Sequence, residues 1–168
     1  MIITHFQLPG GTLLSQTSQY ALRTVLHLAQ LPRGERGAAG DLARAIAVPG
    51  NYLAKTLHQL ARAGIVTGTR GKGGGFVLAR PAARISLAEV VAPFQEVGER
   101  TCLLGRPRCS DARPCAAHAH WKQVAEQVAG FFSRTTVADL LELPADHPVA
   151  ASAGIVKKTS GRSHAALR

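Results

Sequence analysis

The stretch 51–78 constrains the fold more than any other part of this chain. It begins with leucines at three- and four-residue spacing, which predict a helix that Asn51 can cap and that ends at Gly64. Two short β-prone runs, 65–67 and 76–78, then flank a basic, glycine-rich stretch. This order predicts a helix that leads directly into a β-hairpin.

Two further helices are predicted upstream. Apolar residues at helical spacing follow Ser15 and Thr17, either of which can cap a half-buried helix that Pro32 and Gly34 end. A shorter helix, residues 41–48, is joined by a tight turn to the helix that Asn51 begins. Two such helices, the second polar on its outer face, form a helix-turn-helix, and the added hairpin makes a winged helix.

The polar face of this second helix and the hairpin tip are the candidate DNA-binding surfaces. A tip rich in glycine can approach a sugar-phosphate backbone closely, and its basic side chains can bind phosphates. A nucleotide-phosphate loop is excluded because such loops lead into a helix N-terminus, whereas a strand follows here. For each helix side chain, base contact competes with a simple solvated face. The candidate DNA-binding residues are Asn51, Tyr52, Lys55, Thr56, His58 and Gln59 on the helix, and Arg70, Lys72, Gly73 and Gly74 on the hairpin.

Charge is unevenly distributed along the 168 residues, whose 20 Lys and Arg against 10 Asp and Glu give a formal net charge of +10. Residues 1–92 carry ten basic and three acidic side chains, 93–144 carry six of each, and 145–168 carry four and one. A basic domain joined to a neutral segment favours a polyanionic partner for the first part, with solubility as the alternative.

The region after the hairpin predicts a short helix, a long helix and a short C-terminal helix. Ser86 and Glu89 have the spacing of a capping box, which predicts a short helix packed on the wing. A long amphipathic helix, 116–132, carries an apolar stripe that includes Val124 and Phe131 and lacks a partner within the small domain. We therefore expect this stripe to form a dimer interface.

The expected fold class is mostly α with a small β-hairpin wing: a winged helix-turn-helix domain plus a long dimerisation helix. The expected organisation is a flexible N-terminal extension at 1–13, the winged helix-turn-helix at 14–92, a Cys-rich loop at 93–115, the dimerisation helix and a short C-terminal helix at 116–144, and a disordered basic tail at 145–168.

The cysteines form one cluster. Cys102, Cys109 and Cys115 lie within 14 consecutive residues, and His118 follows on the first turn of the predicted long helix. Three thiols and an imidazole make a four-ligand set that either a tetrahedral zinc or an iron–sulfur cluster would accept. The spacing argues mildly against structural zinc, which more often uses two tight pairs, and cysteines without a metal remain a further alternative. His120 is the weaker imidazole candidate.

Membrane and enzyme classes have little support in the sequence. No apolar run approaches the roughly 20 residues that a membrane-spanning helix needs, and the first residues lack the basic start of a signal peptide. We therefore expect a cytoplasmic protein with no membrane partner. No Ser/His/Asp or paired-carboxylate constellation stands out, so we expect no enzymatic activity. A structural adaptor that dimerises without DNA would leave the basic hairpin unexplained.

Taken together, these segments resemble the IscR/NsrR-type (Rrf-type) family of bacterial winged-helix transcription regulators. The resemblance covers about residues 14–143. It is carried by LSQTSQYALRTVLHLA, NYLAKTLHQLARAGIV, RGKGGGFVLARP, PCAAHAHW and FFSRTTVADL.

The resemblance implies a homodimer, joined through the long helix, that binds a palindromic operator in double-stranded DNA, most often as a repressor. DNA affinity would follow the state of an iron–sulfur cluster (2Fe-2S or 4Fe-4S) and so report redox, nitric oxide or iron and cluster status. Cys102, Cys109 and Cys115 match the ligand cysteines, and His118 matches the histidine ligand of the cluster-homeostasis members.

Two departures from the family leave the cluster type open. Six residues separate the first two cysteines where well-known members have five, and Gln19 stands where the nitric-oxide-sensing members carry an acidic ligand. The alternative function is a winged-helix regulator without an iron–sulfur cluster, using zinc or thiol oxidation.

Overall fold

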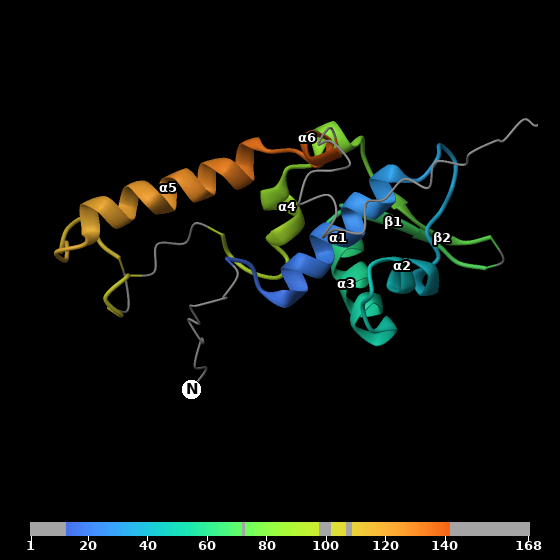
Figure 1. Ribbon diagram of the computed structural model, residues 1–168, viewed down its shortest axis with the longest axis horizontal. Coiled ribbons are helices and arrows are strands. Elements are labelled where there is room, and N and C mark those ends of the chain that lie inside the picture. Colours follow the sequence, from blue (N-terminus) through green and yellow to red (C-terminus); the bar gives the residue numbers. More distant parts are fainter. Residues whose placement is uncertain (1–12, 72, 98–101, 107–108, 142–168) are drawn as a thin grey trace, which may run out of the picture.

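The computed structural model describes residues 13–71, 73–97, 102–106 and 109–141. Within these residues it is mostly helical with one two-stranded antiparallel hairpin, as the sequence predicts (Figure 1). In chain order the elements are α1 (Gln16–Gln30), α2 (Ala39–Ala45), α3 (Gly50–Arg62), β1 (Val66–Thr69), β2 (Gly75–Leu78), the 3-10 turn η1 (Ala82–Arg84), α4 (Leu87–Val91), α5 (His118–Arg134) and α6 (Val137–Leu141). The predicted extension up to residue 12, and everything from residue 142 onward, lie outside the described residues.

The core is organised around α1, which contacts α3, α4, α6 and β2. Ala21 and Val25 of α1 are fully buried, and so are Leu53, Leu57 and Leu60 of α3. The buried faces expected from the apolar spacing of both helices are therefore confirmed.

The hairpin is joined to the helical body through a short backbone bridge. β1 and β2 pair antiparallel, with Val66 opposite Leu78. Gly37, which lies just before α2, exchanges two 2.9 Å backbone hydrogen bonds with Phe76 of β2. A Cβ atom on Gly75 would lie only 2.8 Å from the Gly37 carbonyl oxygen, so this bridge requires glycine at position 75.

Helix starts follow the predicted caps with one exception. The Ser15 hydroxyl caps α1 by accepting a hydrogen bond from the Ser18 N–H, as expected. Asn51 was predicted to cap α3, but the helix begins at Gly50 and the cap position is Pro49, two residues before the predicted cap. The reason is the tight turn before it: the Pro49 carbonyl accepts the first helical hydrogen bonds, from Tyr52 and Leu53.

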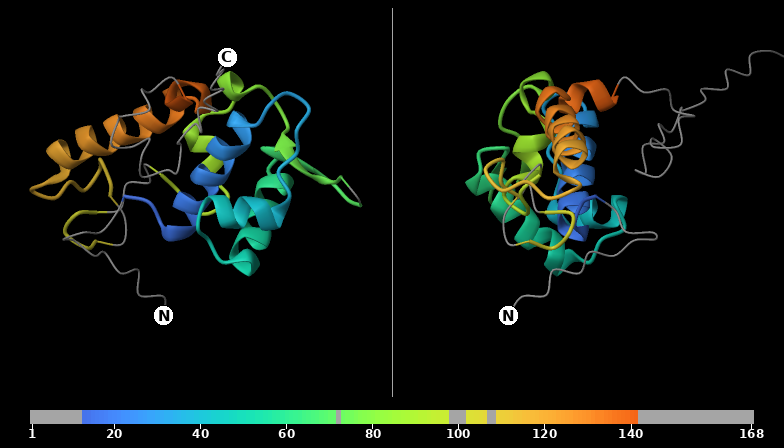
Figure 2. Two further views of the ribbon diagram at one scale, coloured as in Figure 1. Left: turned by 45° about the vertical axis from the view of Figure 1, so that its right-hand side comes forward. Right: turned by 90° about the vertical axis from the view of Figure 1, so that its left-hand side faces the viewer.

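The two C-terminal helices, α5 and α6, lie differently relative to the body. The long α5 extends away from it, whereas α6 turns back and packs on α1 and η1 (Figures 1 and 2). The short α4 was expected on the wing, but its main contacts are with α1 and α5. None of the described helices combines the length and apolar character needed to cross a membrane.

Candidate functional site

The outer face of α3 presents most of the predicted helix side chains to solvent. Asn51, Lys55, His58 and Gln59 are exposed, and Tyr52 keeps 55% of its surface accessible. These side chains are positioned by the leucines on the inner face, which are locked into the core. The structure therefore brings five of the six predicted residues of this helix to one exposed surface.

Thr56 is the exception, because it is only 1% exposed. Its hydroxyl donates a 3.0 Å hydrogen bond to the Tyr52 carbonyl within the helix. The residue lies three positions after Leu53 and four before Leu60, so it shares their inward face. The expectation that Thr56 faces the solvent side is wrong.

The hairpin projects from the body on the side away from the free end of α5 (Figure 1). Arg70 and Gly73 are exposed near its tip, and the predicted Lys72 lies outside the described residues. Gly74 has a structural function as well, because a Cβ atom there would lie 2.3 Å from the Thr69 carbonyl oxygen. The hairpin therefore needs glycine at 74 whether or not DNA approaches it.

Sequence reasoning missed Arg36 as a residue of this region. Its guanidinium donates a 2.9 Å hydrogen bond to the Thr69 hydroxyl at the end of β1. It adds an arginine at the end of β1, where Arg70 follows Thr69 in the chain. No periodic pattern could have indicated it, because Arg36 lies in the irregular loop before α2.

Cys102 and Cys115 form the first of two pairs in the cysteine loop. Their Sγ atoms are 3.8 Å apart, and Cys102 is buried. Backbone hydrogen bonds from Arg106 and from Leu104 hold the pKa of the Cys102 thiol below its usual range, because they stabilise the thiolate.

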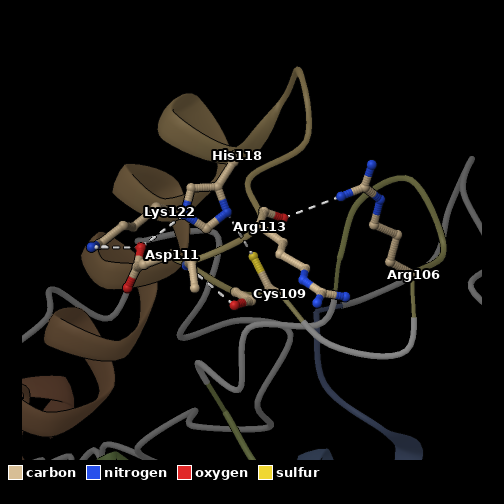
Figure 3. Close-up of polar contacts among 8 residues, drawn as sticks. Arg106, Cys109, Asp111, Arg113, His118 and Lys122 are labelled. Carbon is tan, nitrogen blue, oxygen red and sulfur yellow. Dashed lines mark hydrogen bonds and ion pairs between the residues drawn. The ribbon is translucent and has the colours of Figure 1, made fainter.

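Cys109 and His118 form the second pair, at the first turn of α5 (Figure 3). The distance from Cys109 Sγ to His118 Nδ1 is 3.3 Å, and the imidazole is only 8% exposed. Its other nitrogen, Nε2, lies 2.8 Å from Asp111 Oδ1. The same Asp111 oxygen accepts a 3.0 Å hydrogen bond from Lys122 on the next turn of α5.

The two pairs have donor spacings that fit a thiolate-bound metal. Metal–sulfur bonds of about 2.3 Å at a tetrahedral angle put two ligand sulfurs about 3.8 Å apart, and a sulfur and a nitrogen slightly closer. The observed 3.8 Å and 3.3 Å distances are close to these values. In the described part of the chain no three such donors gather as one group, so the four predicted ligands stand as two pairs. His120 is exposed and has no part in either pair.

Comparison with known proteins gives one family. A family model described as Rrf2, an iron-dependent transcriptional regulator, matches residues 14–143. An Aquifex aeolicus protein provisionally named an HTH-type transcriptional regulator is 31% identical over 138 residues, which cover 80% of this chain and 95% of that protein. The HTH-type transcriptional regulator IscR of Klebsiella pneumoniae is 27% identical over 128 residues, which cover 76% of this chain and 78% of IscR.

Solved structures show the same fold. CymR, the global cysteine regulator of B. subtilis, superposes with a TM-score of 0.67 at 20% identity, covering 80% of this chain and 96% of CymR. IscR of T. potens gives a TM-score of 0.63 at 21% identity, covering 79% of this chain and 88% of that protein.

Proposed function

The chain belongs to the Rrf2 family of transcriptional regulators, and from this premise we propose that it is a homodimeric repressor whose operator affinity responds to an iron–sulfur cluster. It is a DNA-binding regulator homologous to IscR, and not an enzyme. We place its action in the cytoplasm, where the operator DNA is.

The DNA-binding surface in this proposal combines α3 with the hairpin. Lys55, His58 and Gln59 enter the major groove of the DNA and read base edges. Arg70 at the wing binds the sugar-phosphate backbone of the DNA. Phosphate contacts supply most of the affinity and make it dependent on salt. The net charge of +10 supports such a partner.

Dimerisation in this proposal uses the exposed stripe of α5. Val124 and Phe131 are 46% and 52% exposed, and they lie seven residues apart on one face of the helix. Two copies joined there would present two α3 helices to a palindromic operator, because a twofold dimer matches a twofold-symmetric site.

The observation that carries the cluster proposal is that the three thiols and the imidazole stand in two pairs, Cys102 with Cys115 and Cys109 with His118, at distances that suit metal ligands. Cys102, Cys109, Cys115 and His118 would hold the cluster. When bound, it supplies one-electron redox chemistry and iron that oxidants or nitric oxide can attack.

The position of the loop supports a switch. Residues 102–115 end two residues before the cap of α5 at Ala117, and His118 is the first residue of that helix. A change in how the loop is held would therefore move the start of α5 relative to the DNA-binding body. The spacing between the two α3 helices of the dimer would then change, and operator affinity with it.

The test is the absorption spectrum and the iron, sulfide and zinc content of protein purified without oxygen. We expect broad visible absorption with stoichiometric iron and sulfide, and loss of both in Cys102→Ala. Leu104→Ala is the matched control, because Leu104 is an exposed residue of the same loop without a ligand atom. A colourless wild-type protein would contradict the cluster proposal.

The alternative without a cluster has one observation in its favour. Because the Cys102 and Cys115 sulfurs are only 3.8 Å apart, hydrogen peroxide could oxidise the two thiols to a disulfide while being reduced to water. Stoichiometric zinc in the colourless protein would favour a zinc site. A metal-free protein that forms this disulfide with peroxide would favour thiol sensing.

A further inference from the structure

Asp111 makes two contacts that link the cysteine loop to α5. Its Oδ1 atom lies 2.8 Å from His118 Nε2 and 3.0 Å from Lys122 Nζ. His118 and Lys122 are four residues apart on α5, so both face the same side of the helix. One oxygen of the Asp111 carboxylate therefore contacts two side chains, one from each of two successive turns of α5 (Figure 3).

The hydrogen bond to His118 determines which ring nitrogen carries the proton. An ionised carboxylate only accepts hydrogen bonds, so Nε2 must be the donor. In the neutral imidazole, the lone pair is then on Nδ1. This is the nitrogen that lies 3.3 Å from Cys109 Sγ, on the opposite edge of the ring from Asp111.

From this geometry we propose that Asp111 is a positioning residue: it keeps the proton of His118 on Nε2 and so presents Nδ1, beside Cys109, as the metal-binding nitrogen. Histidine ligands in metal sites typically donate their other N–H to a carboxylate, which fixes the tautomer and the ring orientation. The inference rests on the proposed function in taking His118 as a ligand.

Burial makes this contact important for the ring. His118 is 8% exposed, so few waters can replace Asp111 as the acceptor for Nε2–H. The Asp111 side chain itself is 56% exposed and is held by Lys122, whose ammonium binds the same oxygen. Lys122 therefore helps to hold Asp111 but does not contact the imidazole through any hydrogen bond described in this region.

The first experiment reads the tautomer in the reduced, metal-free protein by long-range proton–nitrogen NMR of the His118 ring. We expect the proton on Nε2 in the wild type and a substantial Nδ1-protonated population in Asp111→Ala. Lys122→Met should keep the wild-type tautomer, because it leaves the Asp111–His118 contact intact. Asp41→Ala is the matched control, since it removes an exposed carboxylate that is paired with Arg44 on α2.

The second experiment measures Co²⁺ affinity by competition with a chelator, following the absorption of the thiolate-bound ion. Loss of an outer carboxylate partner typically weakens metal binding about 10- to 100-fold, and we expect that loss for Asp111→Ala. Asp111→Asn retains an acceptor oxygen and should recover part of the affinity. It also serves as the test if Asp111→Ala does not fold.

Three results would overturn the inference: a wild-type imidazole protonated on Nδ1, a cationic ring protonated on both nitrogens, or variants with unchanged tautomer and Co²⁺ affinity. The proposed function fails differently, by a wild-type protein that carries neither cluster nor metal. The tautomer measurement is independent of that failure, because it uses metal-free protein.

Discussion

Neighbouring residues on α3 differ sharply in what they can do. Thr56 is enclosed by the core, whereas Gln59, one turn later, is exposed. The Thr56 hydroxyl is already committed to the Tyr52 carbonyl. A threonine that cannot reach solvent cannot read a base, so the proposed DNA-reading set of this helix is narrower than its polar residues indicate.

We therefore expect opposite outcomes for two substitutions. Thr56→Val keeps the shape of the buried side chain and should leave operator affinity unchanged. Gln59→Ala should weaken operator binding by about 1 to 3 kcal/mol, the usual value of a good base contact. Fluorescence anisotropy with operator and scrambled duplexes at fixed salt measures both.

The control for these two variants is Ala61→Ser, on the exposed side of the same helix. It should bind operator like the wild type. Loss of specific binding in Thr56→Val with normal folding would contradict the assignment of Thr56 to the core.

Two helix starts are coupled side by side at the C-terminal end of the body. Ser86 and Glu89 form the predicted capping box of α4, and Thr136 and Asp139 form a corresponding pair at α6. An antiparallel bridge joins Ser86 to Thr136, so each cap stabilises the other's position. The hydrogen bond from the Ser86 N–H, together with Arg80, holds the pKa of Glu89 below its usual range.

Glu89→Ala should lower the free energy of unfolding by about 1 kcal/mol at pH 7, the usual contribution of a cap. A lowered folded-state pKa means that the stabilisation is complete above the unfolded value, near 4.5, and is lost as the pH falls through the folded value. The difference between wild type and variant should therefore shrink below pH 4.5. Urea unfolding at several pH values measures it.

Glu89→Gln is the matched control, because glutamine preserves the capping hydrogen bonds without a titrating carboxyl. Its stability relative to Glu89→Ala should not change over this acidic range. A wild-type advantage over Glu89→Ala that grows on acidification would refute the assigned role of the capping box.

At the scale of the whole molecule, helix α5 is buried along one face and exposed along another. Phe132 of this helix is buried against Leu87 and Val91, which anchors α5 to the body through one face. Val124 and Phe131 remain exposed on another. An amphipathic helix that extends from its domain gains stability by burying such a stripe against a second copy.

We expect the double variant Val124→Glu and Phe131→Glu to be monomeric. Burial of each apolar side chain contributes roughly 1.5 to 3 kcal/mol. The dissociation constant of the dimer should therefore rise at least about 100-fold. Sedimentation velocity gives the assembly state, and the same variant should lose tight operator binding. Gln123→Glu, an exposed change on the same helix, should remain a dimer. A monomeric wild type would contradict the dimer proposal.

The winged-helix architecture could be predicted from the sequence because its signals are local. Leucine spacing predicts the buried face of α3, glycines mark the hairpin, and Ser86 with Glu89 marks the start of α4. Even the burial of Thr56 had a signal, since it lies at helical spacing from Leu53 and Leu60. The prediction missed it because a polar side chain was assigned to the solvent face.

The sequence by itself thus determined the winged-helix elements and the group of cysteines with His118, because periodicity and turn chemistry act over a few residues. Only the tertiary structure decided which donors face one another. Cys102 pairs with Cys115, and Cys109 with His118, across an irregular loop that has no periodic pattern. The contact of Asp111 with His118 and Lys122 likewise depends on how that loop folds back onto α5, and spacing along the chain does not encode such a return.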